Sequence, residues 1–264
     1  MIGALLLSSS LSAAELTHIG QAARLSLPAT ELKILVWNIH RGDDDLFSYD
    51  YQKLTRDKDL VLLQEANLDS DLARTLKLPK LQLVHAESFT SPLSSTKMGV
   101  ATLSKAAPVT NVGLKSPVTE LKTTTPKVSL IQTFRLSGTR QTLLVANVHA
   151  INFVPNVDFV KHIAQISKAI AFHRGPMIVA GDFNTWNVDR LIYLDKILSV
   201  IKLKRVDFPA GRTRFPSIGY ILGTLTGGEL DHVYVRGLKV IDSHVEVTVT
   251  TSDHKPLELT LDLH

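Results

Sequence analysis

An apolar run that leads straight into a carboxylate is the feature that most constrains how this chain folds. Residues 177–184 read Met-Ile-Val-Ala-Gly-Asp-Phe-Asn and follow directly after Pro176. A short apolar run with such boundaries is typical of a strand buried on both faces. Successive strand residues face opposite ways, so Asp182 and Asn184 would share one side of the strand end while Phe183 points to the other. An isolated match of this kind is equally consistent with a turn in which Asp and Asn bond their own backbone.

Recurrence of the same layout favours an active site over a turn. Three other apolar runs also end in carboxylate, amide or imidazole side chains. They are residues 32–38, which end in Asn38, residues 60–65, which end in Glu65, and residues 142–149, which end in Asn147 and His149. Ligands commonly bind at the carboxyl ends of sheet strands. Burying polar groups costs free energy unless each has a partner, so we expect these side chains to converge.

The hydrophobic pattern combines many short apolar runs with a few segments of helical period. Apolar residues at helical spacing predict helices over residues 46–56, 68–76, 157–172 and 188–203. Further strands are expected over residues 81–86, 99–103, 128–136, 230–235, 238–249 and 257–261. Residues 15–30 and 109–126 have no clear period and contain prolines, so we expect them to be irregular. Many strands with few helices predict an α/β domain in which helices cover sheets.

Length and composition limit which classes of protein and of functional site are possible. The chain has 264 residues and is 44% hydrophobic, which allows an ordinary globular core. It contains no cysteine, which excludes disulfides, thiolate metal sites and a cysteine nucleophile. A formal net charge of +4 is compatible with a polyanionic substrate but does not require one.

The N-terminal segment differs from the rest of the chain. Residues 1–14 partly resemble a signal peptide, but no Lys or Arg precedes their short apolar patch. Cytoplasmic and exported locations therefore stay equally open. No segment has enough uninterrupted apolar residues to span a bilayer. We divide the chain into a signal-like or irregular lead-in, residues 1–30, and one domain, residues 31–264; the oligomeric state stays open.

The polar residues at and near the strand ends form an oxygen-rich set with two histidines and no sulfur. They are Asn38, Glu65, Asn147, His149, Asp182, Asn184, Asp231, Asp253 and His254. Carboxylate and amide oxygens are hard ligands that suit Mg²⁺ or Mn²⁺. Hydrolysis of a phosphate ester needs a metal ion, a further carboxylate to activate water and a histidine to stabilise charge. The set therefore predicts metal-assisted phosphoester hydrolysis.

Six short motifs follow one another along the chain. They are Trp37-Asn38, Gln64-Glu65, Asn147-Val148-His149, Gly181-Asp182-Phe183-Asn184, Leu230-Asp231-His232 and Ser252-Asp253-His254-Lys255-Pro256. In this order they resemble the endonuclease/exonuclease/phosphatase superfamily, which has the DNase I-like fold. Residues 34–39, 62–66 and 147–150 also resemble its compact bacterial YafD-like branch. The resemblance implies two mixed β-sheets packed face to face with helices on the outer faces, a four-layer sandwich.

The resemblance also implies a divalent-metal site. Glu65 would be the principal ligand of Mg²⁺, with Mn²⁺ as the alternative ion. Asn38 and Asp253 would assist it.

The remaining motif residues carry catalytic roles by the same resemblance. Asp182 would orient or deprotonate the attacking water, and Asn184 would hold the nucleophile or a phosphoryl oxygen. His149 and His254 would bind the scissile phosphate, with one of them able to serve as acid or base. Asp231 would accept a hydrogen bond from His254 and raise its pKa. The implied reaction is in-line attack of water on phosphorus without a covalent intermediate.

Three readings of the activity stay open. The favoured one is a Mg²⁺-dependent phosphodiesterase acting on nucleic acid. The basic run over residues 202–215 could contact the backbone of that nucleic acid, but a solvated loop is equally consistent with the run. The second is a phosphatase or phospholipase-like hydrolase acting on a lipid head group or a small phosphoester, which an exported protein would fit. The third is a binding protein that has lost catalysis. Retention of every expected acid, amide and histidine argues against the third.

Overall fold

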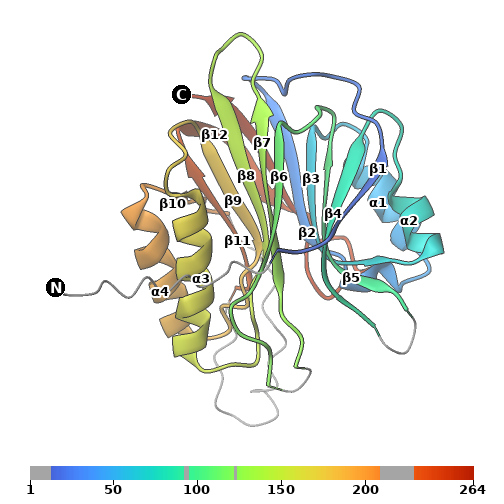
Figure 1. The fold of residues 1–264 in the computed structure, drawn as a ribbon. Helices are drawn as coiled ribbons and strands as arrows, with labels where there is room; N and C mark the ends of the chain where they lie inside the picture. The colour runs from blue at the N-terminus through green and yellow to red at the C-terminus, as the bar shows by residue number, and fades with distance from the viewer. Residues whose placement is uncertain (1–12, 92–94, 122–123, 209–228) are drawn as a thin grey trace, which may run out of the picture.

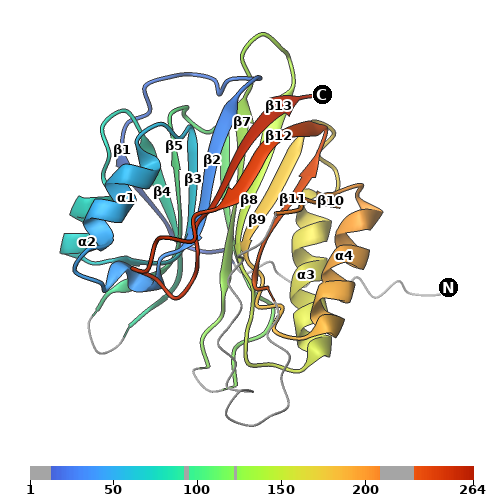
Figure 2. The same ribbon diagram turned by 180° about the vertical axis from the view of Figure 1, so that it is seen from behind.

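Two mixed β-sheets pack face to face in this protein, and helices cover the outer face of each sheet (Figure 1). The computed structural model describes residues 13–91, 95–121, 124–208 and 229–264. Seen from behind in Figure 2, helices α1 and α2 cover one side of the sandwich, and α3 and α4 cover the other. The predicted α/β class and four-layer sandwich are confirmed.

The first sheet has seven strands in the order β1-β4-β5-β3-β2-β13-β12. Their bounds in that order are Leu16–Gly20, Gln82–Thr90, Lys97–Ser104, Leu60–Leu68, Leu32–Asn38, Leu257–Leu263 and Leu238–Val245. Strands β2 and β3 are parallel, and every other neighbouring pair is antiparallel.

The second sheet has six strands in the order β10-β11-β9-β8-β7-β6. Their bounds in that order are Lys204–Arg205, Asp231–Arg236, Met177–Asp182, Thr142–His149, Val128–Arg135 and Thr110–Lys115. Here β8 and β9 form the parallel pair. Each sheet therefore has a parallel pair inside it, with the two carboxyl ends of the pair at one edge.

Apolar side chains fill the space between the sheets and the space under the helices. Ile34 and Leu62 from the first sheet pack in one cluster with Val145 and Ile178 from the second. The helices lie close to their expected positions. They are α1 (Phe47–Thr55), α2 (Ser70–Leu76), α3 (Asn156–Ile170) and α4 (Val188–Val200). The short 3₁₀ helix η1 (His40–Gly42) lies where the sequence predicts no helix. Within the described residues, no helix is both long enough and apolar enough to cross a membrane.

Two segments expected to be irregular contain strands, so that expectation is wrong for part of each. Leu16–Gly20 form β1, which pairs with β4, and Thr110–Lys115 form β6, which pairs with β7. Both are edge strands with several half-buried or exposed positions, so neither shows the continuous apolar run of a central strand. The division of the chain at residue 30 stays a prediction, and residues 1–12 lie outside the described residues.

His162 on α3 is fully buried and contributes stability that depends on pH. Its Nδ1 accepts a hydrogen bond from the backbone N–H of Ile151 at 3.2 Å, and burial lowers the pKa of His162 from its ordinary 6.5 to about 3. On acidification below pH ~6.5 the unfolded chain binds a proton here that the folded chain does not. The contribution of His162 to the free energy of unfolding is therefore fully present above pH ~6.5 and is lost as the pH falls below that value. Urea unfolding at pH ~7 and pH ~4.5 should show a loss of about 1–3 kcal/mol from this residue.

The control for this prediction is His162→Gln. Glutamine keeps an acceptor for Ile151 but does not titrate in this range, so this part of the acid sensitivity should disappear. An unchanged pH dependence in the variant would contradict the prediction.

Candidate active site

All of the predicted site residues except Asp253 lie at or close to the place where the parallel strand pairs of both sheets end. In the second sheet His149 and Asp182 are register partners at the ends of β8 and β9. In the first sheet Asn38 ends β2 beside Gln64 of β3. The sheets pack face to face, so these two strand ends lie together and bring side chains far apart in sequence within contact.

Glu65, His149 and Asp182 form a cluster that could hold a metal ion. One ligand atom from each lies within 4.8 Å of the others. The Nε2 atom of His149 is 3.9 Å from Glu65 Oε1 and 3.6 Å from Asp182 Oδ2. Two carboxylates and an imidazole are a suitable donor set for Mn²⁺ or Mg²⁺, so the residues present fit the predicted ion. The cluster includes His149 and Asp182, which the sequence assigned to catalysis rather than to the metal.

The backbone at Glu65 is bent to direct its carboxylate into this cluster. Its φ is 52°, in the left-handed region that non-glycine residues seldom adopt. The pairing of β3 with β5 shifts register between Leu63 and Ala66, which is the signature of a bulge. Strain of this kind persists only where the surrounding structure enforces it, and it is common at functional sites.

Asn38 presents its amide nitrogen to the two carboxylates. Its Nδ2 donates to Asp182 Oδ2 at 3.1 Å and to Glu65 Oε1 at 3.3 Å. Its Oδ1 accepts from the backbone N–H of His40 at 3.1 Å. The structure therefore places Asn38 as a residue that positions both carboxylates, and its role as a metal ligand stays a prediction.

Asp182 is held by two donors in a buried position. Besides Asn38, the backbone N–H of Asn184 donates to Asp182 Oδ1 at 2.8 Å. Burial raises the pKa of Asp182, the positive charge of His254 opposes the rise, and the carboxylate of Asp231 adds to it. A carboxylate with this raised proton affinity suits proton abstraction. The Asn184 side chain donates from Nδ2 to the backbone oxygen of Ala150 at 2.9 Å, so it joins two loops of the site.

His254 and Asp231 form a buried pair beside this carboxylate. His254 Nδ1 bonds Asp231 Oδ2 at 2.7 Å, as the sequence predicted, and His254 Nε2 lies 4.0 Å from Asp182 Oδ2. Burial alone would lower the pKa of His254, but the charge and hydrogen bond of Asp231 raise it to about 10. His149 differs, because burial lowers its pKa well below the ordinary value and the nearby charge of Lys127 lowers it further. The site thus pairs a protonated histidine with a neutral one.

Asp253 is the predicted residue that the structure does not bring into the cluster. Its side chain is half exposed, and its Oδ1 bonds His40 Nδ1 at 3.0 Å. The preceding Ser252 donates from Oγ to the backbone oxygen of Asn38, which ties this loop to the end of β2. The role of Asp253 as a metal ligand stays a prediction.

Asn147, which the sequence left open between a site residue and a structural amide, joins the two sheets. Its Nδ2 donates to the backbone oxygens of Leu63 and Ala101, and its Oδ1 accepts from Gln64 Nε2 at 2.7 Å. All four of these residues are fully buried. Asn147 therefore holds the sandwich together beneath the site.

Sequence reasoning missed Arg190, a buried residue on α4 with 0% exposure. Its guanidinium donates to the backbone oxygen of Asn184 at 3.0 Å and to those of Asn152 and Val154, both at 2.7 Å. It therefore joins the loop after β8 to the loop after β9, and these loops follow His149 and Asp182. The sequence does indicate that Arg190 is buried, because it lies four and eight residues before the buried Leu194 and Leu198 and therefore on the same face of the helix.

A small cleft of about 150 Å³ opens beside the cluster. Arg41 and Lys127 line it together with the apolar side chains of Phe89 and Met98. Arg41 pairs with Asp43 at 3.0 Å and Lys127 with Glu120 at 3.7 Å. Two cations near Glu65 and His149 suit an anionic substrate.

The basic run over residues 202–215, which the sequence left open between a nucleic-acid contact and a solvated loop, contributes no described residue to the lining of this cleft. Lys202 lies beside Pro176, which precedes β9, whereas Asp182 ends that strand. Arg205 of the run lies in β10 and pairs with Asp195 at 3.2 Å, whereas Arg212 and Arg214 lie outside the described residues.

The chain is similar in sequence to known proteins. The profile described as "Endonuclease/Exonuclease/phosphatase family" matches residues 35–254. A UPF0294 protein of Vibrio campbellii, a group in the YafD-like branch, is 32% identical over 243 residues, covering 89% of this chain and 78% of that protein.

Two solved structures have the same fold. An endonuclease/exonuclease/phosphatase family protein from Leptotrichia buccalis superposes with a TM-score of 0.66 at 19% identity, covering 88% of this chain and all (100%) of that one. The mannosyl-6-phosphatase of Bacteroides thetaiotaomicron superposes with a TM-score of 0.60 at 17% identity, covering 87% and 99%.

Proposed function

Since the chain belongs to the endonuclease/exonuclease/phosphatase family, we propose that it is a Mg²⁺-dependent phosphodiesterase that hydrolyses nucleic acid by in-line attack of water on phosphorus. The observation that carries the proposal is the convergence of Glu65, His149 and Asp182 with the His254–Asp231 pair at one edge of the sandwich. Each of these side chains comes from a different strand or loop, and burial of so many ionisable groups in one place is typical of a catalytic centre.

The residues of the chain divide the chemical work between them. Asp182, held by Asn38 and by the backbone N–H of Asn184, accepts a proton from the attacking water. The water oxygen forms the new bond to phosphorus as the ester bond breaks. His254, kept protonated by Asp231, donates to a phosphoryl oxygen or to the departing oxygen. A Mg²⁺ ion held by Glu65 and its neighbours would neutralise charge on the phosphoryl oxygens.

The two cations of the cleft support a nucleic-acid substrate. Arg41 and Lys127 lie on the substrate side of the cluster, where they would contact phosphates next to the scissile one. The half-buried Phe89 and Met98, which are paired across strands β4 and β5, provide apolar surface against which a base or sugar could pack.

The second candidate is a phosphatase acting on a small phosphoester or a lipid head group. The favouring observation is the size of the cleft, about 150 Å³, which would enclose a small head group. The structural likeness to a mannosyl-6-phosphatase is a likeness of fold.

Hydrolysis of a substrate panel with Mg²⁺ and with EDTA tests the proposal. The panel holds plasmid DNA, single-stranded DNA, abasic DNA, RNA, sphingomyelin, inositol phosphates and bis-p-nitrophenyl phosphate, with Asp182→Ala as the inactive control. We expect EDTA-sensitive cleavage of nucleic acids that excess Mg²⁺ restores. Cleavage confined to lipids or small phosphoesters would select the second candidate, and EDTA-resistant cleavage that Asp182→Ala retains would refute both.

A further inference from the structure

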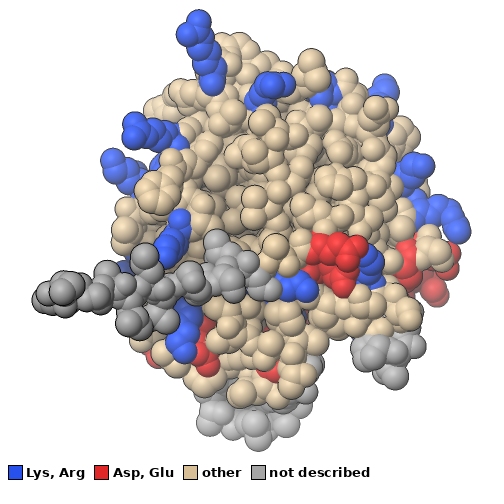
Figure 3. Space-filling view, in the orientation of Figure 1, with Lys and Arg blue, Asp and Glu red and all other residues tan. Residues whose placement is uncertain are grey.

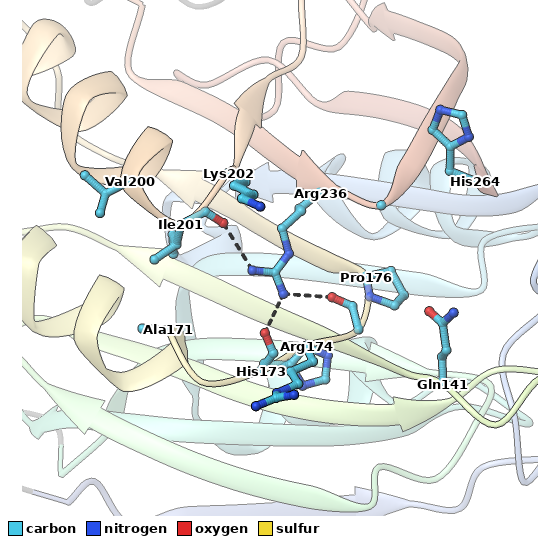
Figure 4. A pocket seen from close by; sticks show the side chains of 12 residues that line it. Gln141, Ala171, His173, Arg174, Pro176, Val200, Ile201, Lys202, Arg236 and His264 are labelled. Carbon is cyan, nitrogen blue, oxygen red and sulfur yellow. Dashed lines mark hydrogen bonds between the residues drawn. The ribbon is translucent and has the colours of Figure 1, made fainter.

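We infer that a second anion-binding groove, for a phosphate group, lies at the edge of the sandwich opposite the catalytic cluster. The groove has a volume of about 610 Å³ and is open to solvent. Arg174, Lys202 and Arg236 line it (Figure 4). It lies beside Met177, where β9 begins, whereas the cluster lies at Asp182, where the strand ends; five residue steps separate the two by roughly 17 Å. A ligand here is therefore not a ligand of the proposed catalytic site.

Arg236 is fixed in place as an unneutralised cation. Its guanidinium donates to the backbone oxygens of Ile201, His173 and Gly175, which Figure 4 shows converging on it. Three of its five N–H groups are used in this way, and the others remain for a ligand. Backbone oxygens neutralise no charge, so the guanidinium keeps its full positive charge at the floor of the groove.

The charged Lys and Arg side chains of the groove all have the same sign. Its lining contains no Asp or Glu side chain. In the part of the chain that the structure describes, Arg174, Lys202 and Arg236 make no ion pair with a carboxylate side chain. On the face drawn in Figure 3, the charged side chains around the upper rim are Lys and Arg, and in the lower half Lys and Arg lie beside Asp and Glu. No Asp or Glu side chain of the lining would therefore compete with an anion for these cations.

Lys202 occupies a backbone position that glycine usually fills. The helix α4 ends in a Schellman motif, in which Lys202 N–H donates to Ser199 O at 2.9 Å and Leu203 N–H donates to Leu198 O at 3.2 Å. Lys202 is the left-handed residue of this motif, with φ of 63°. A lysine there costs stability that glycine would not, and it places an ammonium on the rim of the groove.

The ligand class follows from these donors. A guanidinium, a second arginine and an ammonium around one space match the oxygens of a phosphate or a pyrophosphate better than a single carboxylate. The phosphate could belong to a soluble phosphoester or to a lipid head group. The exposed apolar side chains next to the groove, Phe172 and Val200, would contact acyl chains in the second case.

Site-resolved labelling of the full chain tests the proposal without any use of activity. Lys202 is acetylated and Arg174 is modified with phenylglyoxal, and the rates are read by peptide mass spectrometry at constant ionic strength in EDTA. Pyrophosphate at ten times its dissociation constant should slow both reactions about tenfold. Lys161, near the opposite end of α3 and paired with Asp158, serves as the internal control and should not change.

The variant Lys202→Gly separates binding from folding. It should raise Tm by about 2 °C because glycine relieves the left-handed strain, and it should abolish the protection of Arg174. A destabilised variant could lose binding by unfolding, but a stabilised one cannot. Arg174→Gln should likewise abolish the protection of Lys202.

Vesicles distinguish the two sources of phosphate. Protection of Lys202 by phosphatidylglycerol vesicles, absent with phosphatidylcholine and reversed by pyrophosphate, identifies a lipid head group. Protection by pyrophosphate alone identifies a soluble phosphoester. Equal protection of Lys161, or labelling of Lys202 and Arg174 that no phosphate slows, would overturn the proposal.

Discussion

Replacing Asp182 by asparagine is expected to lower the turnover of phosphoester hydrolysis by about 10²–10⁴-fold, the usual contribution of a general base. Asparagine keeps the shape of the side chain and an oxygen for the backbone N–H of Asn184. It cannot accept a proton, and its amide would face the Nδ2 donor of Asn38. The measurement is kcat on whichever phosphoester the panel identifies.

The same substitution should not weaken the fold. Burial raises the pKa of Asp182, so at neutral pH the folded state bears the cost of an ionised buried carboxylate. Removing that charge should offset the repulsion between the new amide and Asn38 Nδ2, so the free energy of unfolding, measured with urea, should stay within ~1 kcal/mol of the wild-type value. A protein that keeps its stability while it loses activity separates function from folding.

Asp195→Asn is the matched control for Asp182→Asn. Asp195 also bears hydrogen bonds on a carboxylate, from Tyr234 and Arg205, but it lies on α4 away from the cluster. Loss of the Asp195 charge should leave kcat within about twofold of the wild-type value, as is usual for a surface substitution. Equal activity of Asp182→Asn and Asp195→Asn would remove Asp182 from the mechanism.

The parts of the site that could be predicted from sequence lie at the ends of buried parallel strands. Strands β2, β3, β8 and β9 are apolar on both faces, so their runs stand out, and the polar residue that ends each run stands out with them. The sequence predicts Glu65, His149 and Asp182 as site residues for this reason. Parallel pairing then requires that these ends lie at one edge, which the registers confirm.

The parts that could not be predicted depend on loops and on edges. The half-exposed strands β1 and β6 owe their pairing to a single neighbouring strand each, which no local pattern reveals. The position of Asp253 depends on the path of a loop anchored by Ser252, and that path directs its carboxylate to His40. The sequence does not single out Arg190, because most arginines on helices are solvated. Only its helical spacing with the buried Leu194 and Leu198 indicates that its side chain is buried.

Replacing Arg190 by alanine is expected to lower the free energy of unfolding by about 3–5 kcal/mol, because a large buried side chain and the donors of several buried carbonyls are lost together. The guanidinium lies between the rings of Phe159 and Trp186, at 4.8 and 4.6 Å from their centres. Its loss leaves a cavity and removes the donors of the buried carbonyls of Ile151 and Asn184. Urea unfolding measures the loss, and Arg190→Lys should recover only part of it because an ammonium cannot bridge both loops.

Arg190→Ala should also lower kcat at a temperature where the variant is still folded. Its guanidinium donates to the backbone oxygen of Asn184, and the backbone N–H of Asn184 donates to Asp182. Without the guanidinium the two loops could move apart, which would displace the Asp182 carboxylate that accepts the proton. Leu198→Ala on the same helix is the matched control, because it should cost about 2–5 kcal/mol by opening a cavity remote from both loops. If the two folded variants kept equal kcat, Arg190 would contribute stability alone. A drop of about 10–100-fold confined to Arg190→Ala would make it a positioning residue, because small displacements of a catalytic group cost rate in that range.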